Sequence, residues 1–101
     1  MYKVKTTEWD LTEDEQEKAS YILEYIERQQ KLQSRGQPID QDIFAAFNYF
    51  KLVFYHDVAA RVGVHLVKLG EIISGPGYYA HMNLSKDGMK IIGYRVEKEE
   101  L

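Results

Sequence analysis

The chain has 101 residues, no cysteine and a formal net charge of −3. This length suits one domain, so we expect residues 1–101 to form a single domain. Without cysteine there is no disulfide, thiolate metal ligand or cysteine nucleophile, and the negative charge gives no bulk drive toward nucleic acid. The sequence lacks both an apolar leader and a run of about 18 apolar residues, so we expect a cytoplasmic protein without a membrane partner.

The first forty residues predict a strand followed by a helix. Residues 2–7 alternate in character, as a short strand does, and Trp9, just before the next helix, is expected to be a core or staple residue. Thr12, with Glu15 three residues later, is the signature of a capping box at a helix start. We expect this helix to run to about Ser34, because a glycine and a proline follow within four residues.

The stretch from Pro38 to Ile73 is expected to be a long central helix with Asp40 as its N-cap. Large apolar side chains recur in its first half at spacings of three and four, so they share one face, which we expect to be core. They are Ile43, Phe47, Phe50, Phe54 and Val58.

Beyond Phe54 a second apolar stripe is rotated from the first, and two interpretations are open. The helix bends or breaks near His56–Asp57 or at Gly63, or one continuous helix contacts different neighbours at its two ends. In the second case the uncovered stripe predicts a two-fold homodimer, because soluble monomers rarely expose large apolar patches. The stripe comprises Val58, Val62, Leu66, Leu69 and Ile73.

After residue 77 the period changes to two, which predicts strands over residues 78–84 and 89–96. The turn between them, Ser85 to Gly88, places Gly88 for a left-handed conformation. A change of parity beside Gly93 predicts a β-bulge. We therefore expect an α+β fold, with a small antiparallel three-stranded sheet, made of the N-terminal strand and the C-terminal hairpin, packed on two helices. A mostly helical domain with a β-wing is the alternative, but the compact helix-turn-helix spacing is missing.

One candidate site lies on the central helix, where Asp57, Arg61 and His65 follow one another at spacings of four. They could line a small-ligand pocket, or Asp57 and Arg61 could form a salt bridge with His65 at a surface or interface. Arg61 between the other two is a poor neighbour for a cation, so we expect no metal site and no cofactor. No nucleophile motif, phosphate loop or catalytic carboxylate pair is recognisable.

The other candidate site is the C-terminal hairpin, where Tyr79 and His81 are expected on one face with Lys86, Lys90 and Arg95 nearby. Aromatic and basic side chains on a sheet can stack on and neutralise single-stranded nucleic acid. Three cations on an acidic chain instead favour packing or a protein contact.

The missing catalytic pattern and the aromatic content of 13% predict a non-enzymatic protein-binding or regulatory module that acts as a homodimer. Two alternatives remain: a nucleic-acid-binding protein that uses the hairpin, and a small ligand-binding protein or enzyme with the polar cluster of the central helix. A steep salt dependence of oligonucleotide binding would favour the first, and a deep pocket around that cluster would favour the second.

Overall fold

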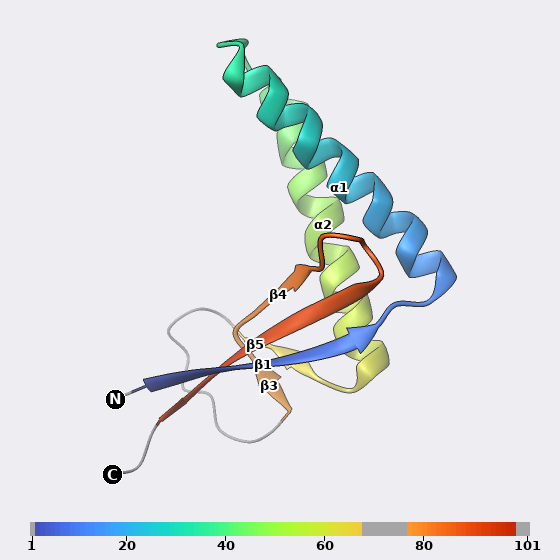
Figure 1. Ribbon diagram of the computed structural model, residues 1–101, viewed down its shortest axis with the longest axis vertical. Helices are drawn as coiled ribbons and strands as arrows, with labels where there is room; N and C mark the ends of the chain where they lie inside the picture. Colours follow the sequence, from blue (N-terminus) through green and yellow to red (C-terminus); the bar gives the residue numbers. More distant parts are fainter. Residues whose placement is uncertain (1, 68–76, 99–101) are drawn as a thin grey trace.

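The computed structural model describes residues 2–67 and 77–98, which form two helices and a three-stranded antiparallel sheet (Figure 1). The sheet has the order β1-β5-β4 and consists of β1 (Tyr2–Asp10), β5 (Lys90–Lys98) and β4 (His81–Leu84). The N-terminal strand thus pairs with the last strand of the C-terminal hairpin. The expected α+β fold is confirmed.

Helix α1 (Glu13–Ser34) begins and ends where its local signals predict. The Glu15 amide donates to Thr12 Oγ1 at 3.2 Å, and the Thr12 amide donates to Glu15 Oε1 at 2.9 Å, which completes the capping box. Ala19 and Ile22 are fully buried against the rest of the molecule. Local hydrogen bonding therefore starts this helix, and a narrow apolar stripe anchors it.

Helix α2 (Gln41–Val62) is shorter than expected, because the helix ends at Gly63. Gly63 adopts φ +79°, a left-handed conformation that glycine adopts without strain, and it ends the helix. Of the two open interpretations, a helix that breaks at Gly63 is therefore confirmed. The interpretation of one continuous helix to Ile73 is wrong. Leu66 lies instead in β2 (His65–Leu66), which pairs in parallel with β3 (Tyr78–Tyr79). Leu69 and Ile73 lie outside the described residues.

The hairpin turn has the expected geometry, with Gly88 at φ +72°. The bulge expected beside Gly93 is wrong, since β5 pairs residue for residue with both neighbours: Gly93 lies opposite Thr7 on β1 and Met82 on β4. The irregularity lies instead at Ala80, where a bend separates β3 from β4. That bend, and not an extra residue in β5, changes which side chains face the core.

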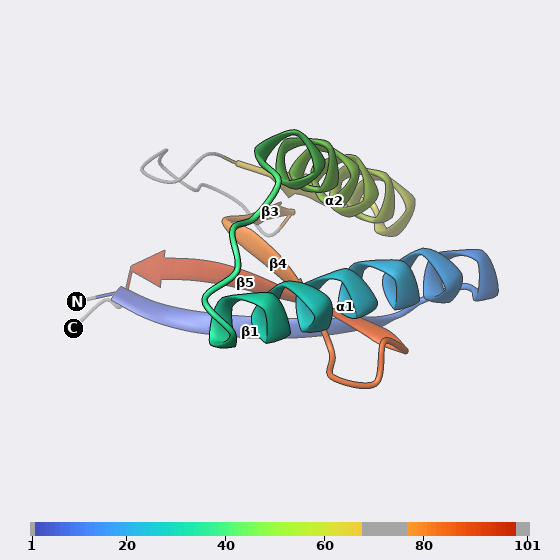
Figure 2. The ribbon, with the colours of Figure 1, turned by 90° about the horizontal axis from the view of Figure 1, so that it is seen from above.

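The core lies between one face of the sheet and the halves of the helices nearest to it. Among the described residues, no buried apolar side chain occurs between Leu23 and Val53. The two helices therefore continue past the sheet as a projecting pair, formed by residues 23–34 and 41–53, which we call the helical arm (Figure 1). Seen from above, α1 and α2 lie side by side (Figure 2). The buried apolar residues are Leu11, Ala19, Ile22, Phe54, Tyr55, Val58, Ala59, Tyr79, Met82, Leu84 and Ile91.

Candidate functional site

The polar cluster expected on the central helix is not formed, because Arg61 binds elsewhere. Its Nε lies 2.8 Å from Glu15 Oε2 and its Nη2 lies 2.7 Å from Glu15 Oε1, so the guanidinium and the carboxylate pair through two atoms each. Nη2 also donates to the Asp10 carbonyl at 2.9 Å. The expected Asp57–Arg61 salt bridge is therefore wrong. Arg61 instead ties the end of α2 to the start of α1.

The same contact changes the acidity of Glu15. Partial burial by itself would raise the pKa of this carboxyl, but hydrogen bonds from Arg61 and from the Thr12 backbone outweigh that effect. The net result is a pKa below the usual glutamate value. The charges of Arg61 and Glu15 pair with each other and connect α2 to α1. The pair therefore has a structural role and offers no free group to a ligand.

His65 is separated from Asp57 and Arg61 by the end of α2. It lies in β2, with its ring centroid 5.4 Å from that of Tyr78. Neither of the two cavities described below is lined by any of these three residues. Within residues 2–67 and 77–98, no three His, Asp or Glu side chains are placed to hold a metal ion together. The small-ligand interpretation of this cluster thus gains no geometric support.

The hairpin side chains Tyr79 and His81 do not share a face, contrary to expectation. Tyr79 is buried, packs edge-on against Trp9 at 5.2 Å between ring centroids, and donates a hydrogen bond to Thr7 Oγ1 at 3.2 Å. His81 is exposed and lies opposite Tyr94 in the sheet. The bend at Ala80 causes the difference, because it reverses the alternation of faces between the two strands.

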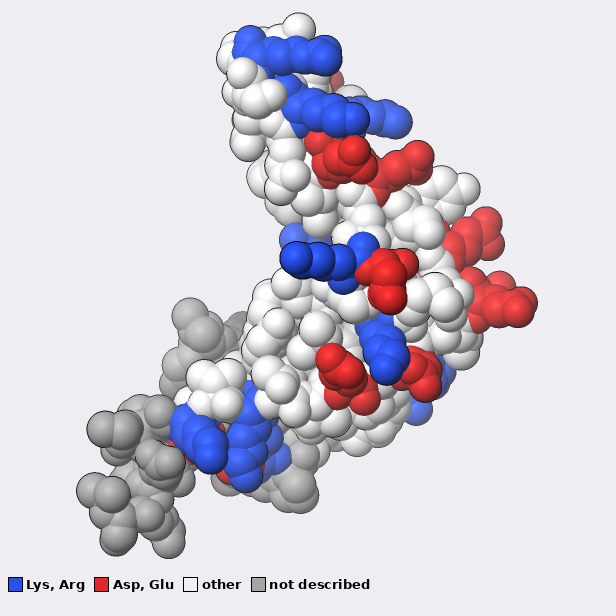
Figure 3. Space-filling view, in the orientation of Figure 1, with Lys and Arg blue, Asp and Glu red and all other residues white. Residues whose placement is uncertain are grey.

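Two of the three hairpin cations lie beside acids. Lys90 Nζ is 3.9 Å from a carboxylate oxygen of Glu8, and Arg95 Nε is 3.0 Å from Glu97 Oε1. A hydrogen bond from Lys5, with the nearby charge of Arg95, lowers the pKa of Glu97. On the face shown in Figure 3, acidic and basic side chains alternate over the centre of the molecule, and basic side chains gather only at the strand ends near the termini. This arrangement gives little support to nucleic-acid binding through the hairpin.

The feature that sequence reasoning missed is the large apolar surface of the helical arm. The prediction that Ile43 and Phe50 are core residues is wrong, because a core helix and an exposed apolar helix have the same periodicity. The sheet does not reach this half of α2, so the side chains stay accessible. The exposed apolar residues are Tyr21 at the base of the arm and Ile43, Phe44, Tyr49, Phe50, Leu52 and Val53 on the arm.

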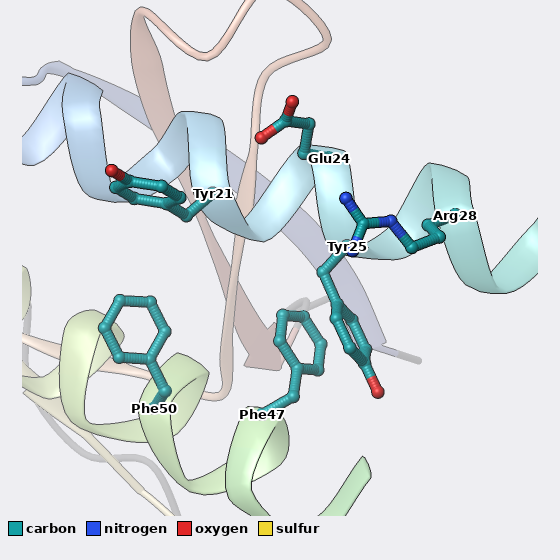
Figure 4. A pocket seen from close by; sticks show the side chains of 6 residues that line it. All are labelled: Tyr21, Glu24, Tyr25, Arg28, Phe47 and Phe50. Atoms are coloured by element: carbon teal, nitrogen blue, oxygen red, sulfur yellow. The ribbon is translucent and has the colours of Figure 1, made fainter. Parts of the chain in front are cut away.

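An aromatic cleft lies between the two helices of the arm (Figure 4). Phe47 and Phe50 point from α2 toward α1, and Phe47 stacks on Tyr25 with 3.9 Å between ring centroids. The cavity has a volume of about 270 Å³. Its walls are Tyr21, Glu24, Tyr25 and Arg28 from α1 and Phe47 and Phe50 from α2.

A second cavity, of about 430 Å³, lies between α2 and β4. Its lining includes Tyr55, His81 and Met82, and it extends to Leu66 and Val67.

In the described part of the chain, neither helix is long and apolar enough to cross a membrane. Comparisons of the chain with protein-family models, with curated proteins and with solved structures found no match. A proposal about function therefore depends on the geometry of the chain itself.

Proposed function

We propose that this chain is a non-enzymatic protein-interaction module that binds an apolar side chain of another protein in the aromatic cleft of its helical arm. The observation that supports it is the combination of an open aromatic cavity with exposed apolar side chains around it. Single exposed apolar residues are ordinary on protein surfaces, but a contiguous group of them marks a contact site.

The size of the cleft favours a side chain over a free small molecule. Its volume of about 270 Å³ is close to the lower limit of the range of roughly 300–1,000 Å³ that is usual for ligand sites. Such a space suits one or two bulky apolar side chains. Tyrosine and arginine are also the residue types that most often contribute strongly to protein binding, and the cleft contains Tyr21, Tyr25 and Arg28.

The shape of the cleft favours an amphipathic helix as the partner element. Two neighbouring helices form a groove, and a third helix can place apolar side chains into it at spacings of three and four. Glu24 and Arg28 lie on α1 above the aromatic rings (Figure 4). They supply a polar rim with one negative and one positive charge. A partner helix with an apolar anchor and flanking charges fits this combination.

The test is selection from a displayed library of helical peptides, followed by titration of the selected peptides by fluorescence anisotropy. We expect enriched peptides to carry bulky apolar anchors at spacings of three or four. Phe50→Asp should weaken their binding at least about tenfold, since one lost anchor contact is worth more than about 1.4 kcal/mol. The matched control is Tyr49→Asp, which makes the same kind of change on the same helix outside the cleft.

Two results would contradict this function. One is that no peptide is enriched, or that Phe50→Asp and Tyr49→Asp bind the selected peptides equally well. The other is tight binding of single-stranded oligonucleotides with a steep salt dependence that Lys86→Ala reduces, which would favour the hairpin as a nucleic-acid site.

A further inference from the structure

The cavity between α2 and β4 plays no part in the proposed protein contact. It shares no lining residue with the aromatic cleft. Its volume of about 430 Å³ lies within the range of roughly 300–1,000 Å³ that is usual for small-molecule sites. The described residues that line it are Asn48, Lys51, Leu52, Tyr55, Leu66, Val67, Ala80, His81 and Met82.

The apolar part of this cavity is built from core residues. Tyr55 and Met82 line it and also belong to the buried core, and Leu66 packs against that core. Ala80, at the bend between β3 and β4, adds only a methyl group to the wall. Because these side chains are held by the packing of the fold, the space is formed before any ligand enters, as is usual for small-molecule sites.

The polar residues that α2 contributes lie toward one end of the cavity. Asn48 and Lys51 are three residues apart on the side of α2 that also carries Tyr55. With a rise of 1.5 Å per residue, Asn48 and Tyr55 are about 10 Å apart along the helix axis. The α2 wall thus changes from polar near the arm to apolar near the sheet. A ligand with a polar head and an apolar body matches this order.

The charge of the lining favours an anionic head. None of the described lining residues is acidic, whereas Lys51 is a cation. Within residues 2–67 and 77–98, Lys51 forms no ion pair, and its Nζ lies 5.7 Å from the centre of the Phe47 ring. This contact with a ring is weak at a partly exposed site, so the flexible stem can turn the ammonium toward a carboxylate.

We propose that this cavity binds a small monocarboxylic acid with an apolar body, of the class of medium-chain fatty acids. The carboxylate pairs with Lys51 and accepts a hydrogen bond from the side-chain amide of Asn48, while the apolar body lies along Tyr55 toward Met82. One ammonium and one amide suit a singly charged head group. A phosphate monoester carries nearly two charges and is normally met by several cations.

Titration of the wild-type chain with three ligands of equal chain length, followed by NMR of the methionine methyl groups, tests the ligand class. The ligands are decanoate, decanol and decyltrimethylammonium. We expect decanoate to shift the Met82 methyl signal and to bind at least about tenfold more tightly than decanol, with no binding of the cation. The exposed Met89, on the hairpin, is the internal control. Equal affinities for decanoate and decanol, or equal shifts of the two methyl signals, would overturn the proposal.

Two neighbouring exposed residues of α2 give a matched pair of variants. Leu52 is 53% exposed and lines the cavity, whereas Val53 is 39% exposed and does not. Leu52→Asp should weaken decanoate binding at least about tenfold, because it places a like charge beside the carboxylate, and Val53→Asp should leave the affinity unchanged. Equal affinities of these two variants would reject the cavity as the site.

Two further variants separate the charge from the location. Lys51→Met, which keeps a long apolar stem, should remove the preference for decanoate over decanol, and a preference that persists would contradict the role of the ammonium. Phe50→Asp, in the aromatic cleft, should leave decanoate binding unchanged, and a loss there would move the ligand to the cleft. Peptide binding by the cleft is measured separately, so either proposal can fail alone.

Discussion

Gly93 is the residue at which the central strand approaches two aromatic rings most closely. A Cβ added there would lie 2.6 Å from Trp9 Cζ3 and 3.0 Å from Tyr79 Cδ1, so even alanine must displace a packed ring. We expect Gly93→Ala to lower the free energy of unfolding by roughly 1–3 kcal/mol, as overpacking of a core does. Urea denaturation measures this change.

The control is Gly77→Ala, where an added Cβ meets no atom within 4 Å. The loss in Gly93→Ala should shrink when it is combined with Trp9→Phe, because phenylalanine lacks the part of the indole that obstructs the Cβ. If Gly93→Ala lowered the free energy of unfolding equally with and without Trp9→Phe, a steric clash with Trp9 would be contradicted. The loss of stability would then originate in the backbone of the strand.

The Arg61–Glu15 pair gives a prediction with a definite pH dependence. Because the pKa of Glu15 is lowered in the folded protein, the unfolded chain binds its proton more readily, and stability must rise with pH across the acid range. The contribution is fully present at neutral pH and is lost as the pH falls through the lowered pKa. For a partly exposed pair we expect about 1 kcal/mol.

The measurement compares the unfolding free energies of the wild type and Glu15→Gln at about pH 7 and about pH 3. The difference between the two proteins should be largest at neutral pH and smallest in acid. Glu17→Gln, which changes an exposed acid on the same helix, should show no such trend. The mechanism is wrong if Glu15→Gln and the wild type lose stability in parallel on acidification.

Elements whose ends are set by neighbouring residues could be predicted from the sequence. The capping box at Thr12 and Glu15 fixes the start of α1, and the left-handed Gly88 fixes the hairpin turn, because each acts within a few bonds. The end of α2 was ambiguous, since Gly63 inside a helical pattern carries a cost that surrounding contacts can override. Here it ends the helix, and the chain continues into a short parallel strand pair.

Contacts between distant segments could not be predicted in the same way. Arg61 binds Glu15, 46 residues away, although Asp57 is a local partner of the right sign. Phe50 and Phe54 belong to one apolar stripe, yet Phe54 is 3% exposed and Phe50 is 40% exposed. The difference depends on where the sheet stops covering α2. The spacing of apolar residues along one helix carries no information about how far a neighbouring sheet extends.

At the scale of the whole molecule the chain is elongated. Its radius of gyration is 15.5 Å, whereas a compact chain of this length has about 13 Å. In the described part of the chain the fully buried side chains lie near the sheet, and the arm is held by contacts such as the Tyr25–Phe47 stack. Since local stability follows the density of buried contacts, we expect the arm to open more easily than the body of the molecule.

Native-state hydrogen exchange of the wild-type chain tests this grading. Backbone amides of residues 27–34 and 42–50 should exchange faster than those of β5, whose hydrogen bonds lie between β1 and β4. Protection should rise along α2 from Ile43 toward Val58, following the change from exposed to buried side chains. Equal protection of the arm and β5 would mean that helices and sheet unfold as one cooperative unit, in which case the apolar surface of the arm is held rigid even without a partner.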